Sequence, residues 1–195
     1  MAVNSGRADL RRRLRALRRE VPPPARIGAA DGLARQLLAL PLRDGARVAG
    51  YWAADGEIPL HAWQLRLPRD TVYCLPVLHA DGRLRFAPWR SGEAVVPNRF
   101  GIPEPEVAPD ALLDPESLDL VVVPLVGFDA RCHRLGMGGG WYDRSFAFRH
   151  HRPAPPRLVG AAFAFQQVDD GLPSETWDVQ LDAVCTDHST ILRPE

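Results

Sequence analysis

The chain has 195 residues, of which 46% are hydrophobic and 25% are charged, and its formal net charge is zero. A soluble globular protein has this composition, so intrinsic disorder, collagen and coiled coil are excluded, and a single domain of this length folds without a disulfide or metal staple. The three cysteines are scattered and form no Cys-x-x-Cys motif, which indicates a reducing environment and a cytoplasmic location.

The N-terminal segment is strongly basic and has the spacing of a helix. Residues 1–19 contain seven arginines against one acid, Asp9, a net charge of +6, whereas the rest of the chain carries −6. Leu10, Leu14 and Leu17 predict one apolar face of a helix over residues 9–20. The segment is open to three interpretations: part of the domain, an organellar transit peptide or a polyanion-binding arm. The complete absence of lysine from the chain indicates coding bias.

The next elements alternate between helix and strand. A second helical pattern follows the proline run at 22–24, which ends the first helix. A Pro-, Glu- and Gly-rich stretch at 91–117 is predicted to be an ordered loop. Between the proline run and this loop, the sequence predicts five elements. The second helix covers 25–40, a strand 47–52 and a short helix 59–67, and two paired strands cover 71–77 and 83–89.

The second half of the chain favours a layered α/β fold. Residues 118–123 are almost continuously apolar and β-branched, as in a strand covered on both faces, and the apolar run is too short to span a membrane. A helix over 141–150 and strands over 157–163 and 180–185 follow. We therefore expect one domain, residues 1–195, with a three-layer α/β/α architecture and a mostly parallel, Rossmann-like central sheet.

A glycine-rich loop carries the most specific chemistry. Four of the five residues 136–140 are glycine, between a buried strand and a predicted helix. Such a loop can bring its backbone N–H groups close to an anion. It is not a Walker loop, which needs lysine, and Trp141 occupies the third glycine position of the dinucleotide pattern. Arg134 before the loop and Asp143 after it add a phosphate partner and a possible metal carboxylate.

Residues 119–144 resemble a long family signature. They read DLVVVPLVGFDARCHRLGMGGGWYDR, and they resemble the motif of the 5-formyltetrahydrofolate cyclo-ligase (methenyltetrahydrofolate synthetase) family. Segments 7–11, 56–58, 101–105 and 172–186 resemble shorter family motifs in the same order, so the resemblance covers almost the whole chain. Three positions depart from the pattern: Arg7 stands in place of lysine, Cys132 in place of glycine and Trp177 in place of histidine.

The resemblance implies an ATP- and magnesium-dependent enzyme. Its reaction would cyclise 5-formyltetrahydrofolate to 5,10-methenyltetrahydrofolate and release ADP and phosphate. Phosphorylation would turn the formyl oxygen into a leaving group, so the protein's task would be positioning and charge neutralisation. The partners would be the reduced folate and ATP. We expect a monomer with no membrane or nucleic-acid partner.

The resemblance also assigns site residues. For ATP these are Arg7, Arg11, Arg134, Leu135, Gly136, Met137, Gly138, Gly139, Gly140, Trp141 and Tyr142. For the folate they are Trp52, Glu57, Phe100, Met137, Gly138, Gly139, Gly140 and Trp141. For magnesium they are Asp143 and Asp182.

The arginines of the first helix divide into two groups. Arg7 and Arg11 are four residues apart and share a helix face, so both can reach phosphate oxygens. Arg12, Arg13 and Arg19 are predicted to be solvated surface. The alternative function is a non-catalytic relative that binds RNA or another polyanion through this helix, and the lack of basic residues interleaved with aromatic ones argues against it.

Overall fold

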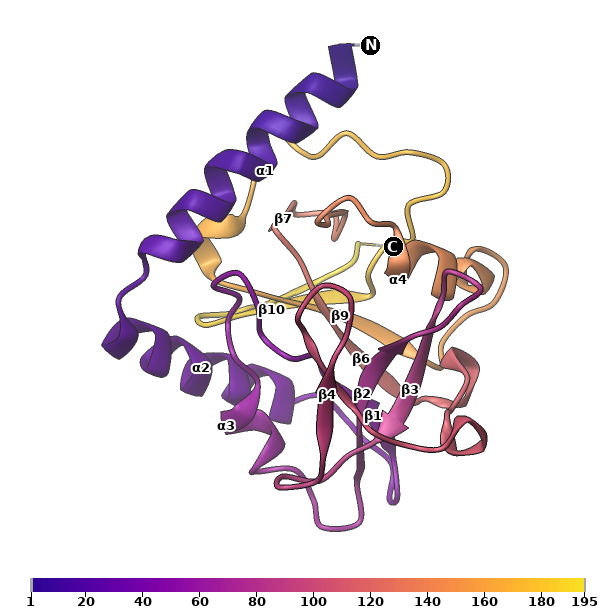
Figure 1. The fold of residues 1–195 in the computed structure, drawn as a ribbon. Helices are drawn as coiled ribbons and strands as arrows, with labels where there is room; N and C mark the ends of the chain where they lie inside the picture. The colour runs from indigo at the N-terminus through magenta and orange to yellow at the C-terminus, as the bar shows by residue number, and fades with distance from the viewer. Residues whose placement is uncertain (1, 195) are drawn as a thin grey trace.

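A seven-stranded sheet forms the centre of the protein. The computed structural model describes residues 2–194, and the strand order is β11-β10-β9-β6-β1-β2-β3 (Figure 1). The five inner strands are parallel, whereas β3 and β11 pair antiparallel at the two edges, which confirms the mostly parallel sheet. The strands are β1 (Arg47–Ala49), β2 (Val72–Leu78), β3 (Leu84–Pro88), β6 (Leu120–Pro124), β9 (Arg157–Ala162), β10 (Ala183–Thr186) and β11 (Thr190–Leu192).

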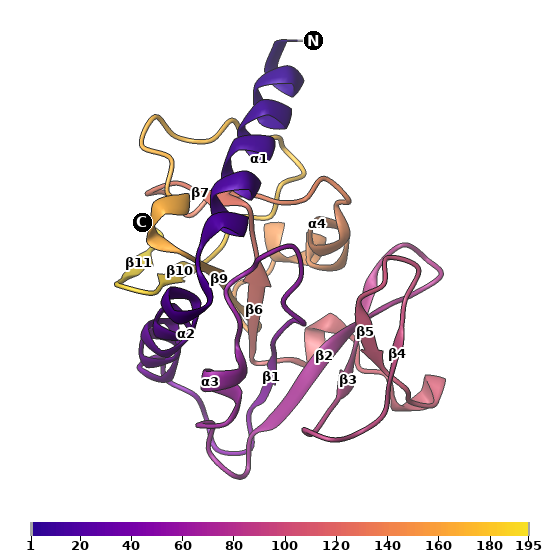
Figure 2. The ribbon, with the colours of Figure 1, turned by 60° about the vertical axis from the view of Figure 1, so that its left-hand side comes forward.

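Helices cover both faces of this sheet. Figure 2 shows α2 and α3 on one side of the strands and α4 on the other, which gives the expected three layers. No helix within residues 2–194 is long and apolar enough to cross a membrane. The helical elements are α1 (Ala2–Glu20), α2 (Pro23–Leu38), α3 (His61–Gln64), α4 (Trp141–Ser145) and the 3-10 turns η1 (Pro109–Ala111), η2 (Pro115–Ser117), η3 (Ala147–His150) and η4 (Ala164–Gln166).

Two expected elements differ from the structure. The stretch 91–117 is not only loop, because it contains an antiparallel hairpin of β4 (Val95–Pro97) and β5 (Pro103–Pro105). The helix predicted over 141–150 is divided into α4 and η3 at Phe146, whose φ of −110° is not helical. A second short hairpin, β7 (Gly127–Phe128) and β8 (Arg134–Leu135), precedes the glycine loop.

The sheet has a topological switch point between β1 and β6. These two strands are neighbours, but the chain leaves β1 through α3 towards β2 and leaves β6 through α4 towards β9, in opposite directions along the sheet. Open α/β sheets bind their ligands in the crevice outside the carboxyl ends of the strands at such a point. The segments that follow β1 and β6 are therefore the expected walls of a binding site.

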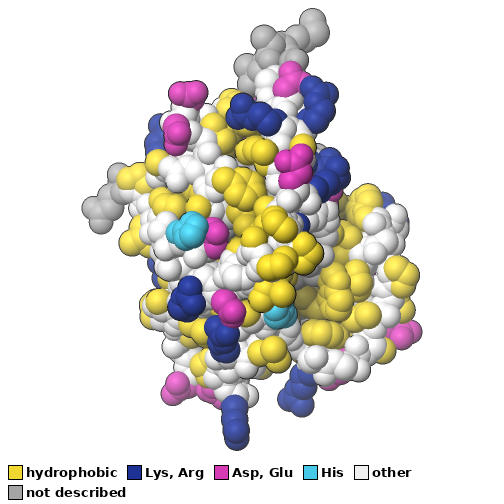
Figure 3. Space-filling view, turned by 90° about the vertical axis from the view of Figure 1, so that its left-hand side faces the viewer, with side chains coloured by type: hydrophobic (Ala, Val, Ile, Leu, Met, Phe, Trp, Pro, Cys, Tyr) yellow, Lys and Arg dark blue, Asp and Glu magenta, His cyan; other side chains and the backbone are white. Residues whose placement is uncertain are grey.

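The first helix docks through Leu14 and Arg18, with Leu10 partly buried beside Leu14, rather than through three leucines. Leu14 is buried against Val126 and Leu135, whereas Leu17 is 44% exposed, so the predicted apolar face is wrong at that position. Arg18 is only 1% exposed and takes its place. Its long aliphatic stem can pack like an apolar side chain while its guanidinium binds buried acceptors. In Figure 3 acidic and basic side chains alternate beneath the grey N-terminal residues.

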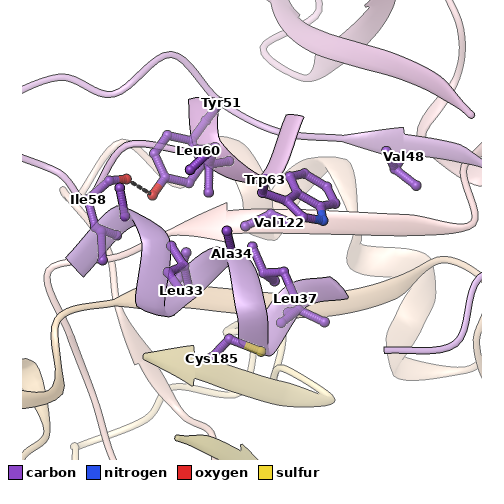
Figure 4. Close-up of a cluster of buried hydrophobic side chains, with 14 of the residues drawn as sticks. Leu33, Ala34, Leu37, Val48, Tyr51, Ile58, Leu60, Trp63, Val122 and Cys185 are labelled. Atoms are coloured by element: carbon purple, nitrogen blue, oxygen red, sulfur yellow. Dashed lines mark hydrogen bonds between the residues drawn. The ribbon is translucent and has the colours of Figure 1, made fainter. Parts of the chain in front are cut away.

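The core follows the period of two expected of parallel strands. On β6, Leu120 and Val122 face the layer of α2 and α3. Val121 and Val123 face the layer of α4. Figure 4 shows the first of these clusters, in which Leu33 and Leu37 of α2 pack beside Trp63 of α3. In the same cluster the hydroxyl of Tyr51 donates a hydrogen bond to the carbonyl of Ile58 at 2.6 Å. This bond closes the loop that follows β1.

Two glycines of α2 provide a matched test of this packing. A Cβ at Gly32 would collide with the carbonyl group of Asp187, whose carbon would lie only 3.0 Å from that Cβ. Gly32→Ala should therefore lower the free energy of unfolding by about 1–3 kcal/mol. Nothing lies within 4 Å of a Cβ at Gly28, so Gly28→Ala should raise it by about 0.5–1 kcal/mol. Urea denaturation followed by circular dichroism measures both. Equal effects would contradict the close approach of α2 to the loop after β10.

Candidate functional site

One large cavity lies at the switch point. It has a volume of about 1030 Å³ and is walled by α1, the loop after β1, the β4–β5 hairpin, the glycine loop with α4, and the loop 175–178. Most of the site residues named from the sequence line it: Arg7, Arg11, Trp52, Glu57, Phe100, Arg134, Gly136, Met137, Gly138, Gly139, Gly140, Trp141, Tyr142 and Asp143. The fold therefore brings together residues up to 171 positions apart in the sequence, from Arg7 to Asp178.

Leu135 and Asp182 do not line this cavity. Leu135 is buried beside Leu14, and its carbonyl accepts the N–H of Val126 at 2.8 Å, so its polar backbone serves the β7–β8 hairpin. Asp182 immediately precedes β10, at the amino end of a parallel strand, whereas the cavity lies beyond the carboxyl ends. The structure thus does not bring Asp182 to Asp143.

The glycine loop needs backbone freedom at two positions. Gly138 and Gly140 have φ values of +98° and +65°, a left-handed region that favours glycine. Arg11 supports the loop from above, because its Nε donates a hydrogen bond to the carbonyl of Gly136 at 2.8 Å. Because α4 has only five residues, its dipole contributes little positive potential to the loop. Arg7, Arg11 and Arg134 supply the main positive charge of the cavity.

Arg7 and Arg11 bring two positive charges to one wall. Arg7 is held by Asp178, with its Nη1 and Nη2 at 3.1 and 3.2 Å from the same carboxylate oxygen. Its Nε is buried and has no hydrogen-bond partner among the described residues. Burial lowers the pKa of Arg11, and the like charge of Arg7 lowers it further. A nearby anion would relieve both effects, so this wall suits a phosphate group.

Asp143 is joined to Arg134 across the cavity floor. Arg134 donates hydrogen bonds to Oδ1 of Asp143 and to the carbonyl of Val179, and the N–H of Val179 donates to the same Oδ1 at 3.0 Å. The second oxygen, Oδ2, has no hydrogen-bond partner within the described chain. Within the same residues, no group of three or more His, Cys, Asp or Glu side chains could hold a metal on its own.

The other end of the cavity is aromatic, with one buried acid. Trp52 and Phe100 are exposed rather than packed in the core, Phe100 by 59%. The Arg99 guanidinium lies over the rings of Phe100 and Trp141, at 5.0 and 5.2 Å from their centroids. Burial raises the pKa of Glu57, and this effect is opposed by the hydrogen bond from the Ala54 N–H and by the charge of Arg18. A flat, hydrogen-bonding ring system would fit such walls.

Three departures from the family pattern have structural outcomes. Cys132 adopts a positive φ of 62°, so the turn expected of glycine is kept despite the side chain. Burial raises the pKa of this thiol to about 11, which leaves it unreactive at neutral pH. Arg7 keeps a charge on the cavity wall. Trp177 is 64% exposed at the rim of the cavity, and no contact in the structure explains the residue type.

Several lining residues were missing from the sequence-based site. Asp178 is the main one, because it forms an ion pair with Arg7. The sequence could have indicated it, since Asp178 lies in the segment 172–186 that resembles a family motif. The hairpin residues Asn98, Ile102 and Glu104 also line the cavity. Glu104 accepts hydrogen bonds from Leu78 N–H at 2.9 Å and from Asn98 at 2.8 Å, which ties the hairpin to the sheet.

Comparison with known proteins gives a consistent family. Residues 3–187 match the model of the 5-formyltetrahydrofolate cyclo-ligase family. The chain is 37% identical over 182 residues to 5-formyltetrahydrofolate cyclo-ligase of Escherichia coli (strain K12), covering 91% of this chain and 96% of that protein. It is 39% identical over 143 residues to the protein of the same name from Haemophilus influenzae, covering 71% of this chain and 74% of that protein.

Solved structures have the same fold. The NMR structure of 5,10-methenyltetrahydrofolate synthetase from Aquifex aeolicus is similar with a TM-score of 0.81 at 25% identity, covering 97% of this chain and 93% of that one. A 5,10-methenyltetrahydrofolate synthetase from Mycoplasma pneumoniae has a TM-score of 0.73 at 22% identity, covering 93% and 99%. This second likeness concerns the fold alone.

The position of Asp182 predicts a role in stability. Arg149 contacts both of its carboxylate oxygens at 2.9 Å, Arg193 lies at 3.2 Å, and the N–H of Leu158 donates at 2.8 Å. Asp182→Asn should therefore lower the free energy of unfolding by about 3 kcal/mol, since it leaves the buried Arg149 without its charge partner. Asp31→Asn removes the exposed pair with Arg66 and should cost less than about 1 kcal/mol. Equally small losses in urea denaturation would contradict this role.

Proposed function

The chain belongs to the 5-formyltetrahydrofolate cyclo-ligase family, and we propose that it converts 5-formyltetrahydrofolate to 5,10-methenyltetrahydrofolate with ATP and magnesium, releasing ADP and phosphate. One observation carries the proposal: a single cavity joins a cationic, glycine-lined wall to an aromatic wall with a buried acid. The two substrates of the reaction, a nucleotide triphosphate and a reduced pterin, need these two environments side by side. We also propose that the protein acts as a cytoplasmic monomer.

The chemistry assigns a positioning task to the protein. The formyl carbon is a weak electrophile and its oxygen leaves poorly. Attack of the formyl oxygen on the γ-phosphorus of ATP releases ADP and makes that oxygen a leaving group. N10 of the folate then attacks the carbon and closes the ring, and the loss of phosphate and of the N10 proton gives the methenyl product. The reaction needs no protein nucleophile, so rate enhancement comes from alignment and from stabilising phosphate charge.

The cationic wall supports triphosphate binding. Arg7 and Arg11 come from α1, and Arg134 comes from β8, directly before the glycine loop. Guanidinium groups from two separate elements can contact different phosphate groups, and the backbone of Gly136–Gly140 would approach them without side-chain obstruction. Since Arg7 and Arg134 each already hold a carboxylate, the cationic groups are oriented before the ligand arrives.

Asp143 is the carboxylate that fits magnesium. Its Oδ1 is committed to Arg134 and Val179, but its Oδ2 faces no hydrogen-bond donor within residues 2–194. Magnesium is commonly held by one or two carboxylates together with phosphate oxygens and water. When bound, the ion would neutralise charge on the transferring phosphoryl group. Asp182 is not part of this proposal, because it lies outside the cavity.

Glu57 and the aromatic residues support folate binding. Glu57 lines the cavity from the loop after β1, and its Oε2 accepts a hydrogen bond from the N–H of Ala54 at 3.0 Å, while its Oε1 lies 3.8 Å from Nη1 of Arg18. A carboxylate there can accept hydrogen bonds from the amino and ring N–H groups of a pterin. Trp52, Phe100 and Trp141 would pack against the ring system and its aromatic extension.

The polyanion-binding alternative finds less support. Of the arginines predicted to be solvated surface, Arg12 is paired with Asp9 on its own helix, and Arg19 is paired with Asp55 although it is 57% exposed. Acidic side chains thus interrupt the basic face of α1, as Figure 3 shows. A nucleic-acid interface usually presents a continuous basic stripe.

The reaction itself is the first test. Purified protein should form the methenyl product, seen by its absorbance, only when 5-formyltetrahydrofolate, ATP and magnesium are all present. Phosphate release should match product formation one to one. Formation of product without ATP, or no product when the folate, ATP and magnesium are all present, would contradict the proposal. Steep salt-dependent RNA binding in the absence of turnover would favour the polyanion alternative.

The arginines of α1 give a second, matched test. Arg11→Ala should lower kcat/KM for ATP about 10- to 100-fold, because it removes a charged hydrogen-bond donor from the phosphate wall. Arg12→Ala should change it less than about twofold, because Arg12 pairs with Asp9 on the solvent side of the same helix. Steady-state kinetics with varied ATP measures both. Equal losses of kcat/KM in the two variants would indicate that Arg11 is only a solvated surface charge.

A further inference from the structure

Three arginines of α1 converge on one carboxylate outside the phosphate wall. Nε of Arg15 and Nη2 of Arg18 lie 2.7 and 2.8 Å from Oδ2 of Asp55, and Nε of Arg19 lies 2.7 Å from Oδ1. Arg18 also donates to the backbone carbonyl of Asp55 at 2.9 Å and to that of Leu125 at 3.1 Å. Asp55 follows β1 and Leu125 follows β6, so α1 is tied to both sides of the switch point.

The loop that carries Asp55 is shaped for this contact. Asp55 and Gly56 have φ values of +49° and +77°, and the N–H of Glu57 donates to the carbonyl of Ala54 at 2.9 Å, which closes a tight turn. Nη1 of Arg26 at the start of α2 donates to the carbonyl of Gly56 at 2.6 Å. Burial raises the pKa of Asp55, but hydrogen bonds from the α1 arginines outweigh this effect and hold the pKa well below its ordinary value.

Apolar burial alone anchors α1 weakly. Of the described α1 side chains, Leu14 and Arg18 are buried, Leu10 is partly buried beside Leu14, and Leu17 is 44% exposed. One buried and one partly buried leucine contribute on the order of 3 kcal/mol, which is small for a helix of this length. The polar contacts to Asp55 are therefore a large part of what orients the helix.

The same helix face carries the phosphate wall. Arg7, Arg11 and Arg15 follow one another at intervals of four residues, so they lie along one face of α1. Arg7 lies about 16 Å along the helix axis from Arg18. Asp178 and the carbonyl of Gly136 hold the end of α1 that carries Arg7 and Arg11, and Asp55 holds the other end. Loss of the Asp55 contacts would leave α1 free to tilt about its N-terminal contacts, which would change the position of both arginines.

We propose that Asp55 is a positioning residue, whose carboxylate binds Arg15, Arg18 and Arg19 and thereby holds Arg7 and Arg11 over the triphosphate site. The proposal rests on the proposed function, since it assigns Arg7 and Arg11 to ATP. It gives Arg15, Arg18 and Arg19 a role that ATP binding alone does not give them. Asp55 lines the same cavity, but its carboxylate is occupied by Arg15, Arg18 and Arg19, so in this scheme it acts on ATP through the position of α1. Nη1 of Arg18 also lies 3.8 Å from Oε1 of Glu57, so the same arginine contacts the folate wall.

The variant that tests this is Asp55→Asn. Asparagine keeps the size of the side chain and tolerates a positive φ, so the turn should survive while the charge is lost. We expect KM for ATP to rise about tenfold and kcat to change less than about threefold, because the chemistry is untouched and phosphate contacts weaken. Asp9→Asn is the matched control, since it removes an exposed pair from the same helix, and it should leave both values unchanged.

A structural measurement accompanies the kinetics. Limited trypsin digestion cleaves after the arginines of α1 only when the helix leaves the body of the protein. Asp55→Asn should increase the initial rate of that cleavage about tenfold, whereas Asp9→Asn should not, and the urea midpoint of each variant reports global unfolding separately. This readout needs no turnover, so it tests the anchoring of α1 even where the proposed activity fails in the wild-type assay.

A milder variant protects against loss of fold. Arg19→Ala removes one of the three partners of Asp55 at an exposed position, so it should fold, and KM for ATP should rise about threefold. An unchanged KM for ATP in both Asp55→Asn and Arg19→Ala, or an equal rise in Asp9→Asn, would overturn the positioning role. A fall in kcat without a rise in KM would also overturn it.

Discussion

The separation of the chain after β1 and β6 is the constraint on which the site depends. The two strands are hydrogen-bonded neighbours, and yet their continuations run to opposite sides of the sheet. Neither continuation can fill the space above the other, so a hollow forms at their carboxyl ends. The wall after β1 supplies Glu57 and the wall after β6 supplies the glycine loop. The cavity therefore has two walls of different chemistry, because each wall comes from a different segment of the sequence.

The charges of the cavity are arranged in pairs before any ligand is present. Asp178 holds Arg7, and Asp143 holds Arg134. A partnered guanidinium keeps its orientation and still has N–H groups for a second anion, so less ordering of the side chain is needed when an anion binds. Arg11 differs, because it contacts a backbone carbonyl and sits beside another cation. Of the three it therefore gains most from an incoming phosphate.

Sequence patterns predicted the elements that periodicity or composition defines, and not those that depend on a distant partner. The strand over 118–123 and the glycine loop were predictable, because buried β-branched runs and glycine clusters have few other uses. Hydropathy predicts Leu17 in the core because leucine is apolar. In the structure Arg18 is buried instead, because it donates hydrogen bonds to the carbonyls of Asp55 and Leu125, which are distant in sequence. Asp182 was assigned to magnesium by resemblance, but its place at the amino end of β10 became visible only with the sheet.

The +6 charge of residues 1–19 now has a physical reason. Five of the seven arginines face a carboxylate in the folded chain, and three of these share Asp55. Three cations on one carboxylate leave a surplus of positive charge along α1, beside the cavity that Arg7 and Arg11 line. A negatively charged substrate is attracted by such a surplus, and the field acts before contact is made. The asymmetry between helix and body is therefore compatible with zero net charge, and it places the surplus of positive charge beside the cavity.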